Sequence, residues 1–470
     1  MMATRPRAAG EQAPPDVRGK RVLVYSLGIE GRDLARWLIA HGAAVTISDT
    51  RGDEQLETAG ARAPEGLERM ATGGPLLDAE GFDLVAVSQS VLRHDPALAR
   101  ARQLGIPITS QMRLFLQLCP GRVVGISGSS GKSTTTALVG AMARAADIDH
   151  IVGGNLGEAL LGRLAEISAS TTVILEISHT QLQYTERSPE IAAVTNVTPN
   201  HLDQFSWDEY VGLKRNLLAY QSRGSVAILN ADDPTSRAIA AGVRGQLART
   251  SIAGEVDGDG AWVEGGDVVV RRGRLARAVL PVAEIRLRGQ HNLANVVMAC
   301  AIADAAGLPM EAARAAAAAF AGVPHRLQVV GRVGGATWID DSIATSPERT
   351  IAGLRAFTEP VVLLLGGREK NLPLDGLRSL AATRCRAVVC FGEAGPLFCE
   401  GMEGAVPACH LVGTLDDAVA LAAALARPGD VVLLSPAGTS FDAYPNFEAR
   451  GAAFAALARA LPGFQPEVTP

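Results

Sequence analysis

Residues 122–134 read RVVGISGSSGKST, and this stretch decides the fold of the central part of the 470-residue chain. Its apolar start predicts a buried strand, and the glycines and serines that follow predict a turn that opens a helix near Lys132. Such a turn directs backbone N–H groups at phosphate oxygens, and the helix N-terminus favours negative charge. We therefore predict a P-loop of the shorter GxxGKS form, since Ile126 stands where the strict pattern has glycine.

The residues of this turn suit a nucleoside triphosphate. Lys132 would bring a mobile positive charge to the β- and γ-phosphates, and Ser133 would offer a hydroxyl to Mg²⁺. The alternative is a Gly- and Ser-rich loop before an ordinary helix, and the preceding strand argues against it. The predicted ATP-binding residues of the loop are Gly128, Ser129, Ser130, Gly131, Lys132, Ser133 and Thr134.

Polar side chains follow the neighbouring strands predicted at 172–176 and 191–196. Glu176 ends the first strand, and His201 lies in the polar run NVTPNHLD that follows the second. The carboxyl ends of parallel strands meet at one edge of a sheet, where an acid can hold a metal ion. Taken alone, Glu176 could be a strand-end acid and His201 a structural histidine. Paired with a P-loop and Glu176, ligand or substrate contact is favoured for His201.

The first segment predicts a nucleotide-binding α/β unit. A strand at 21–27, a tight turn at 28–31, a helix at 32–41 and a strand at 44–49 follow one another. A full GxGxxG is absent, because Glu30 and Asp33 occupy the second and third glycine positions. These side chains argue against a dinucleotide such as NAD. A further strand at 84–87 runs into the polar sequence SQS, 88–90.

The remaining sequence predicts more α/β structure. Short strands between 254 and 287 read as a small antiparallel appendage, and an Ala-rich helix at 292–306 follows. The last unit has predicted strands at 336–340, 361–365, 387–391 and 431–434. We expect a disordered leader at 1–18 and domains at 19–118, 119–321 and 322–470.

Composition narrows the functional classes. A formal charge of −5 and a pI near 6.0 give no overall positive field for nucleic acid. The six cysteines form no CxxC pair, which indicates structural thiols in a reducing cytoplasm. No apolar run reaches the roughly 18 residues of a membrane-spanning helix. A monomer is the default expectation.

The ordered motifs resemble those of the Mur ligase family over nearly the whole chain. They include GSSGKST, LEIS, NVTPNHLD, NADD, GQHNLAN, PHR, IDDS, LLLGG and LLSPAGTS. The sequences at 325–331 and 435–451 resemble the glutamate-adding members best. The resemblance implies an α/β fold of three domains: a Rossmann-like UDP-binding domain, a central P-loop ATPase-type domain with a parallel sheet and small antiparallel appendage, and a Rossmann-like C-terminal domain.

The resemblance also implies a function. It implies ATP-dependent addition of D-glutamate to UDP-N-acetylmuramoyl-L-alanine in cytoplasmic peptidoglycan precursor synthesis, with ATP and two Mg²⁺ ions, or Mn²⁺. A carboxylate is a poor electrophile, and phosphoryl transfer to it makes an acyl phosphate that the amine of glutamate can attack. The alternatives are the same reaction with L-glutamate, a folylpolyglutamate synthetase-like ligase, and a non-catalytic nucleotide-binding regulator.

Site residues follow from the resemblance position by position. Lys132, Glu176, His201 and Lys214 would be catalytic, although Lys214 alone reads as a solvated surface lysine in a helix at 207–218. Ser133, Glu176, His201 and a carbamylated Lys214 would hold the metal ions. The UDP-substrate contacts would be Ile29, Glu30, Asp49, Thr50, Arg51, Ser88, Asn155 and His201. Further ATP contacts would be Asn292, Asn295, Arg326 and Asp341, and glutamate contacts Thr345, Lys370, Ser440 and Phe447.

Four short segments depart from the usual pattern of the glutamate-adding members. SQS at 88–90 replaces Ser-Pro-Gly, SHTQ at 178–181 replaces Ser-Ser-Phe-Gln, and Asn200 replaces an acid. Ile343 stands where lysine is usual. The loss of that charge could signal L-glutamate as the substrate, or another cation could substitute for it.

Overall fold

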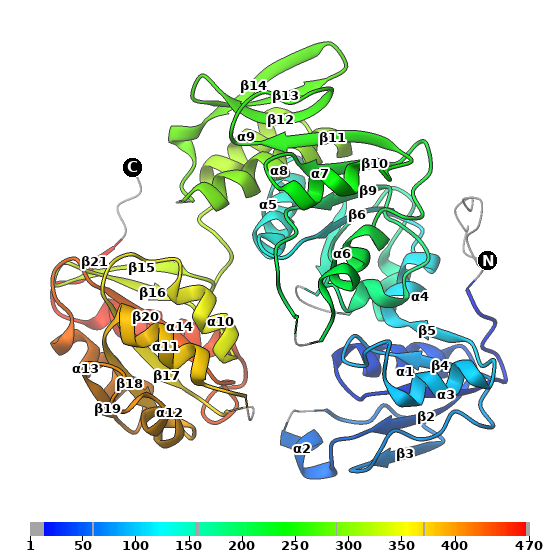
Figure 1. Cartoon of the computed structure of the whole chain (residues 1–470), viewed down its shortest axis with the longest axis horizontal. Helices are drawn as coiled ribbons and strands as arrows, with labels where there is room; N and C mark the ends of the chain where they lie inside the picture. Colours follow the sequence, from blue (N-terminus) through cyan, green and yellow to red (C-terminus); the bar gives the residue numbers. More distant parts are fainter. Residues whose placement is uncertain are drawn as a thin grey trace. The chain divides into compact units, whose positions relative to one another are not determined.

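The computed structural model describes residues 14–58, 61–155, 159–202, 204–287, 289–369 and 372–466. The chain divides into two compact units between Phe320 and Ala321. The first unit contains two sheets and the second unit contains one (Figure 1). Among the residues that the structure describes, no helix combines the length and the apolar character that crossing a membrane requires.

The first sheet is parallel, with five strands in the order β3-β2-β1-β4-β5. Its elements are β1 (Arg21–Tyr25), α1 (Ile29–Ala40), β2 (Ala44–Asp49), α2 (Asp53–Thr58), β3 (Arg69–Thr72), β4 (Leu84–Val87), α3 (Pro96–Gln103), β5 (Ile108–Ser110) and α4 (Gln111–Leu118). The tight turn predicted at 28–31 is wrong, because Gly28 is the N-cap and α1 begins at Ile29. A Cβ at Gly31 would lie 1.8 Å from the Ser26 carbonyl oxygen, so this glycine permits close helix–strand packing.

The second sheet has nine strands in the order β14-β13-β12-β11-β10-β9-β6-β8-β7. Its strands are β6 (Arg122–Ser127), β7 (His150–Gly154), β8 (Thr172–Glu176), β9 (Ile191–Val194), β10 (Val226–Asn230), β11 (Gln246–Ser251), β12 (Asp259–Glu264), β13 (Asp267–Arg272) and β14 (Leu275–Pro281). All run parallel up to β12, and β13 and β14 add an antiparallel hairpin at the edge. The predicted appendage is therefore a continuation of the P-loop sheet.

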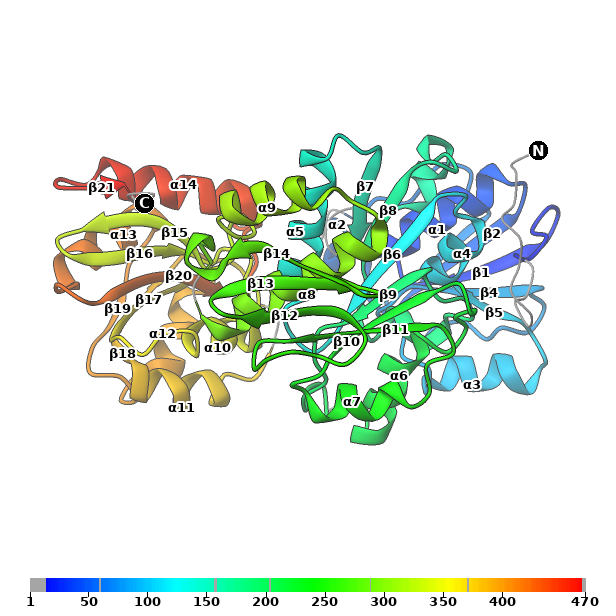
Figure 2. The same ribbon diagram turned by 90° about the horizontal axis from the view of Figure 1, so that it is seen from above.

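Helices cover both faces of the second sheet. They are α5 (Lys132–Ala145), α6 (Trp207–Asn216), α7 (Pro234–Ala240), α8 (Gln290–Ala306) and α9 (Met310–Ala319), with short 3₁₀ helices at Leu161–Glu166, Gln181–Tyr184 and Val282–Glu284. Helices α5, α8 and α9 pack together over one face (Figure 2). Val124 and Ile126 of β6 belong to the aliphatic core beneath them.

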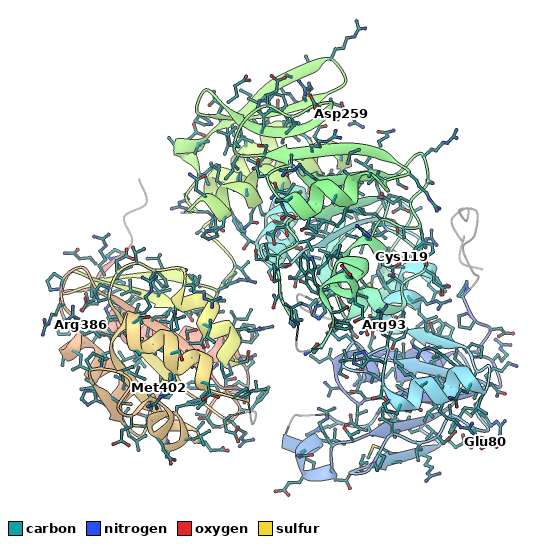
Figure 3. The ribbon with its side chains drawn as sticks, viewed as in Figure 1. Glu80, Arg93, Cys119, Asp259, Arg386 and Met402 are labelled. Carbon is teal, nitrogen blue, oxygen red and sulfur yellow. The ribbon has the colours of Figure 1, made fainter. Side chains whose placement is uncertain are left out.

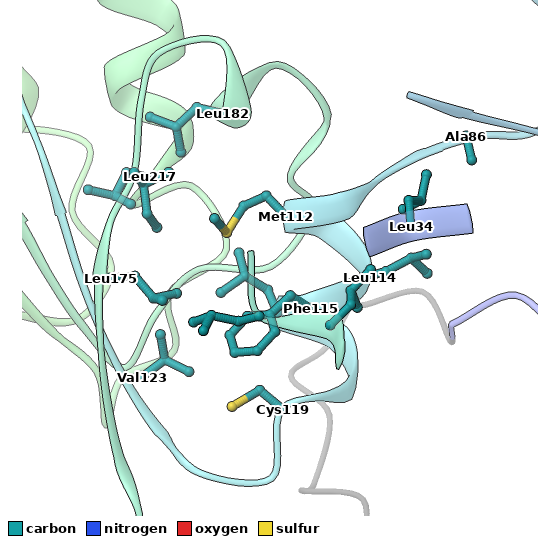
Figure 4. Close-up of a cluster of buried hydrophobic side chains, with 14 of the residues drawn as sticks. Leu34, Ala86, Met112, Leu114, Phe115, Cys119, Val123, Leu175, Leu182 and Leu217 are labelled. Atoms are coloured by element: carbon teal, nitrogen blue, oxygen red, sulfur yellow. The ribbon is translucent and has the colours of Figure 1, made fainter. Parts of the chain in front are cut away.

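The other face of the second sheet shares a core with the first sheet. Leu114 and Phe115 of α4 lie between Leu34 of α1 and Leu175 of β8 (Figure 4). All four side chains are at most 1% exposed. Because one continuous apolar cluster joins the two sheets, their carboxyl edges are held in a fixed relation within the first unit.

The second unit is a seven-stranded sheet in the order β19-β18-β17-β20-β16-β15-β21. Its elements are β15 (Gln328–Val333), β16 (Ala336–Asp340), α10 (Pro347–Leu354), β17 (Val361–Gly366), α11 (Asp375–Arg384), β18 (Cys385–Phe391), α12 (Gly395–Met402), β19 (Cys409–Leu411), α13 (Leu415–Leu425), β20 (Val431–Ala437), α14 (Phe447–Ala460) and β21 (Gln465–Pro466). Strands β19 to β16 are parallel, whereas β15 and β21 pair antiparallel. The unit is the Rossmann-like layer that the sequence predicts, with an antiparallel edge.

Part of the predicted leader is described. Residues 1–13 lie outside the described residues, whereas Val17 is buried against the first sheet and Gly19 N donates to Gly42 O at 2.8 Å. The described cysteines are all free, in agreement with structural thiols. Four are buried, and Cys399 and Cys409 are half-buried. Figure 3 shows Cys119 in the first unit beside its neighbouring side chains.

Candidate active site

The P-loop connects the end of β6 to the start of α5. Gly128 has φ 148° and Gly131, the N-cap of α5, has φ 80°, a conformation that residues with a Cβ rarely adopt. A Cβ at Gly128 would lie 1.9 Å from Thr195 Oγ1, and one at Gly131 would lie 2.2 Å from Asn295 Oδ1. The two glycines are therefore required both by backbone conformation and by close neighbours.

The residues after β9 hold the P-loop in its shape. Ser129 N donates to Asn196 O at 2.9 Å, and Ser130 N donates to Asn196 Oδ1 at 3.0 Å. Thr195 Oγ1 donates to Ser130 O at 2.6 Å. Sequence reasoning placed Asn196 at this sheet edge but assigned neither residue a role. Their support of the loop depends on the pairing of β9 with β6, which spacing alone does not reveal.

Lys132 lies over the loop that precedes it. Its Nζ donates to Gly128 O at 2.9 Å and to Ser129 O at 3.1 Å. These carbonyls hold the ammonium at the position where the loop would meet phosphate oxygens. The geometry fits the predicted role of Lys132 as a phosphate-neutralising cation.

Lys214 of α6 is completely buried beneath the same loop. Its Nζ donates to Ser127 Oγ at 3.1 Å and to Gly128 O at 3.0 Å. Burial lowers the pKa of Lys214 well below its ordinary value, and the nearby charge of Lys132 adds to this effect while Glu176 opposes it. The interpretation of Lys214 as a solvated surface lysine is wrong. A neutral buried amine is chemically able to capture CO₂, as the predicted carbamylation requires.

Glu176 ends β8 and is 2% exposed. Its Oε1 accepts a hydrogen bond from Asn155 Nδ2 at 2.7 Å, so the two predicted residues are in contact. Its Oε2 is buried and has no hydrogen-bond partner among the described residues. A buried carboxylate oxygen without a donor is costly unless a cation occupies the place.

His201 lies against a second histidine. The ring of His179 stacks on that of His201 with centroids 4.0 Å apart and planes 28° apart. Burial lowers the pKa of His179 to about 3, and the charges of His201, Lys214 and Lys132 contribute in the same direction. His179, in the departing SHTQ segment, therefore lies beside a predicted site residue, and sequence reasoning assigned it no role.

A magnesium site fits these donors. The unpartnered Oε2 of Glu176 is a hard anionic oxygen, and Ser133, the second residue of α5, is the other ligand of the predicted scheme. Among the described residues, the only three His, Cys, Asp or Glu donors that lie within 4.8 Å of one another are Cys390, Cys399 and Cys409 in the second unit. The Glu176 site would therefore rely on nucleotide phosphates and water for further ligands, as Mg²⁺ sites commonly do.

The predicted UDP contacts lie at the carboxyl edge of the first sheet. Asp49 accepts hydrogen bonds from Leu27 N at 2.7 Å, Arg51 N at 2.9 Å and Arg51 Nη2 at 2.7 Å. Although burial raises the pKa of Asp49, these hydrogen bonds lower it below its ordinary value. Ile29 is 63% exposed and Thr50 is exposed. They are therefore accessible to a ligand at the switch point between strands, where doubly wound sheets bind nucleotides.

Two further predicted UDP contacts are engaged inside the protein. Ser88 Oγ is 2.8 Å from Ser90 Oγ. Glu30 is 8% exposed, and its carboxylate accepts hydrogen bonds from Gln181 Nε2 at 2.5 Å and Gln89 N at 2.7 Å. Burial raises the pKa of Glu30. Both carboxylate oxygens of Glu30 therefore already accept a hydrogen bond, and a ligand that contacts Glu30 would share these oxygens with Gln181 and Gln89.

The predicted adenine contacts belong to both units. In the first unit, Asn295 Nδ2 donates to Asn292 Oδ1 at 3.3 Å in the first turns of α8. In the second unit, Asp341 accepts hydrogen bonds from Ser435 Oγ at 2.8 Å and Leu327 N at 3.2 Å. Burial raises the pKa of Asp341 to about 7, while Ser435 and the charge of Arg326 act in the opposite direction.

The predicted glutamate contacts lie in the second unit. Ser440 is buried and follows β20, and the Phe447 carbonyl oxygen accepts a hydrogen bond from Ser342 Oγ at 2.8 Å. Thr345 N donates to Ile343 O at 2.9 Å. The fourth residue, Lys370, lies outside the described residues.

A cation lies beside Ile343. Arg349, in the first turn of α10, donates from Nη1 to Ile343 O at 3.1 Å. Sequence reasoning considered a substituting cation here without identifying one. The guanidinium of Arg349 places a positive charge beside the backbone of Ile343.

Comparisons with known proteins identify the family of this chain. A model of the Mur ligase middle domain matches residues 126–303, and one of the Mur ligase glutamate ligase domain matches residues 325–438. The UDP-N-acetylmuramoylalanine--D-glutamate ligase of Symbiobacterium thermophilum is 40% identical over 453 residues, which cover 94% of this chain and 98% of that protein. The protein of the same name from Acidobacterium capsulatum is 39% identical, with 95% and 98% covered.

Solved structures share the fold at low identity. The UDP-N-acetylmuramate-alanine ligase of Thermotoga maritima gives a TM-score of 0.52 at 16% identity, covering 93% of this chain and 98% of that one. The murein peptide ligase of Psychrobacter arcticus gives 0.51 at 19% identity with the same coverage. From the matched domains and the near-full-length relatives, this chain belongs to the Mur ligase family.

Proposed function

We propose that the chain uses ATP to join D-glutamate to UDP-N-acetylmuramoyl-L-alanine, in the cytoplasmic synthesis of peptidoglycan precursor. The observation that carries this proposal is the arrangement around the P-loop. Lys132 donates to the loop carbonyl of Gly128, and Lys214 is buried beneath the loop. Glu176, whose charge raises the pKa of Lys214, has a buried carboxylate oxygen without a partner among the described residues. The names of relatives at 33–40% identity over nearly the whole chain support the choice of substrates.

The P-loop residues would position the triphosphate for attack by a carboxylate. Its backbone N–H groups and Lys132 offset negative charge as the substrate carboxylate approaches the γ-phosphate. Ser133 and Glu176, with His201 and a carbamylated Lys214, would hold two Mg²⁺ ions, or Mn²⁺. When bound, the metal supplies positive charge that neutralises phosphate oxygens. The product of this step is an acyl phosphate, whose leaving group is phosphate rather than oxide.

The amine of glutamate then attacks the acyl carbon and expels phosphate. Ser440, Thr345, Lys370 and the backbone of Phe447 would bind the glutamate, and Asn292, Asn295, Arg326 and Asp341 the adenine nucleotide. Ile29, Glu30, Asp49, Thr50, Arg51, Ser88 and Asn155 would bind the UDP-sugar. Exclusion of water would protect the acyl phosphate from hydrolysis. We propose a monomer as the working form.

The stereochemistry of the amino acid is the alternative to test. Ile343 removes a charge from the predicted glutamate site, and this departure favours L-glutamate as the second candidate substrate. Arg349 on the Ile343 carbonyl and the D-glutamate ligase names of the relatives support D-glutamate. Pure enantiomers supplied separately, with chiral analysis of the product, decide between them.

Phosphate release by the purified chain is the test of the function. Release should require UDP-N-acetylmuramoyl-L-alanine, glutamate and Mg²⁺ together, with product confirmed by mass. Lys132→Ala should lower the rate by about 100-fold or more, since loss of one charge-stabilising donor typically costs that much. Lys20→Ala, at an exposed lysine, is the matched control. Steady ATP hydrolysis without the muramoyl substrate would instead favour another ligase or a regulator.

A further inference from the structure

A closed ring of hydrogen bonds joins the two sheets of the first unit. Gln89 N donates to Glu30 Oε2 at 2.7 Å, and Gln181 Nε2 donates to Glu30 Oε1 at 2.5 Å. Ser178 N donates to Gln181 Oε1 at 2.9 Å, and Ser178 Oγ donates to Gln89 Oε1 at 2.9 Å. The ring therefore connects the start of α1, the turn after β4 and the loop that follows Glu176.

The ring fixes the side chain of Gln89 at its carbonyl end. Gln89 Oε1 accepts from Ser178 Oγ and also from Thr180 Oγ1 at 3.3 Å, which occupies both lone pairs of the amide oxygen. The same carboxamide carries an NH₂ group. Within the described part of the chain nothing accepts a hydrogen bond from that group, and the Gln89 side chain is half-buried. Two oriented donors are thus left over for a ligand.

The position of Gln89 matters for the proposed reaction. It directly follows Ser88 at the carboxyl edge of the first sheet, where nucleotides bind in doubly wound folds. Through Ser178 it also contacts the loop two residues beyond Glu176. Gln89 therefore lies where the carboxyl edge of the first sheet meets the loop after Glu176 of the second sheet.

The chemistry of the junction favours a neutral donor. Glu30 is buried beside Gln89, and burial raises the pKa of its carboxyl group. A lysine or arginine here would be drawn into an ion pair with Glu30 and would not serve an anionic substrate. The side-chain NH₂ of Gln89 can donate to phosphate, sugar or carbonyl oxygens. At the same time the backbone N–H of Gln89 donates to the carboxylate of Glu30.

A second contact stabilises the same junction. Arg93, labelled in Figure 3, donates from Nη2 to Glu209 Oε1 at 2.7 Å, and its backbone N donates to Gln183 Oε1 at 2.7 Å. The turn after β4 is therefore held to the central sheet at both ends of the segment 89–93. Loss of the two hydrogen bonds that the Gln89 side chain accepts should leave this turn in place, so the side chain is testable by substitution.

We propose that Gln89 is a substrate-binding residue of this ligase, whose carboxamide NH₂ donates to an oxygen of the UDP-sugar acid at the junction of the two sheets. This role rests on the proposed function and specifies a contact within it. Ser178 and Thr180 are then positioning residues, because they orient the amide without touching the substrate.

Binding of UDP-N-acetylmuramoyl-L-alanine to the full-length chain, measured by calorimetry, tests this role. Gln89→Met keeps the length of the side chain and removes its donors, and Gln89→Glu keeps an acceptor for Ser178 while replacing the NH₂. Both should raise the Kd about 10-fold, with the Kd for ATP and the thermal midpoint near wild type. Ser178→Ala should raise the same Kd by a smaller factor, about 3-fold. Gln103→Glu, at an exposed glutamine of α3, is the matched control.

The outcomes separate the two proposals. Gln89→Met or Gln89→Glu with wild-type affinity for the UDP-sugar acid would overturn the role of Gln89 while the proposed function stands. If the wild-type chain itself binds none of this substrate, the proposed function and the role of Gln89 fall together. A loss of affinity for ATP equal to that for the UDP-sugar acid would identify a general structural defect and also overturn the role.

Discussion

Asp341→Asn should remove a pH-dependent loss of stability from the second unit. The Asp341 carboxyl is 4% exposed, and burial raises its pKa to about 7 from an ordinary 3.8. It accepts hydrogen bonds from Ser435 Oγ and Leu327 N. An asparagine can accept from Leu327 N and donate to Ser435 Oγ, so the neutral amide reproduces the protonated acid at every pH.

The sign and size follow from proton linkage. Because the folded-state pKa lies above the unfolded one, the folded chain binds a proton that the unfolded chain releases between pH 3.8 and 7. The stabilisation is complete below pH 3.8 and is lost as pH rises through 7. A difference of about 3 pH units corresponds to about 4 kcal/mol, of which about 2.5 kcal/mol is lost between pH 5 and pH 8.

Urea denaturation of wild type and Asp341→Asn from pH 5 to pH 8.5 measures this effect. The difference between the two unfolding free energies isolates residue 341, because every other titrating group is common to both chains. We expect the variant to gain about 2.5 kcal/mol relative to wild type over this range. A difference that stays constant with pH would refute the burial argument, because it would mean that Asp341 is already ionised in the folded chain at pH 5.

Three further substitutions or treatments follow from described contacts. Gly131→Ala should weaken ATP binding at least about 10-fold, measured by calorimetry. The added Cβ would lie 2.2 Å from Asn295 Oδ1, and the backbone φ of 80° is unfavourable for alanine. Unchanged affinity for ATP would contradict this loop geometry. Arg349→Ala should lower kcat/KM for glutamate about 10-fold, because it removes the positive charge beside Ile343. Adding Ile343→Lys to this variant should restore most of the lost kcat/KM. No recovery would mean that Arg349 does not replace the lysine charge that is usual at position 343. Burial raises the pKa of the Cys300 thiol to about 12. In the folded chain at pH 8, a disulfide reagent should therefore react only with the half-buried thiols of Cys399 and Cys409, and after denaturation it should react with all six thiols. Rapid reaction of Cys300 in the folded chain would contradict its burial.

The order of elements could be predicted where hydrophobic patterns are long. The strands at 44–49, 172–176 and 336–340 have the predicted limits, because each is an apolar run that ends in an acid or a turn. Strands β3 and β19 were missed, since each has at most four residues and lies at the edge of its sheet. Short, partly solvated strands carry little pattern of their own.

The burial of Lys214 could have been predicted from helical periodicity. Tyr210 and Val211 precede it by four and three residues, and Leu217 and Leu218 follow it at the same intervals; all four are buried. A lysine in the middle of an apolar stripe signals a buried amine. The ring through Gln89 could not have been predicted in this way, because its long-range hydrogen bonds join residues 59, 89 and 151 positions apart and depend on how two sheets pack.

The shared apolar cluster around α4 determines where this enzyme can be cut and recombined. Separation after residue 118 would expose Leu114 and Phe115, both at most 1% exposed in the intact unit, and would leave each fragment with half a core. Chimeras between relatives should therefore exchange the whole first unit, up to Phe320, as a single segment. The junction between Phe320 and Ala321 offers the natural breakpoint for domain swapping, fusion or insertion of a reporter.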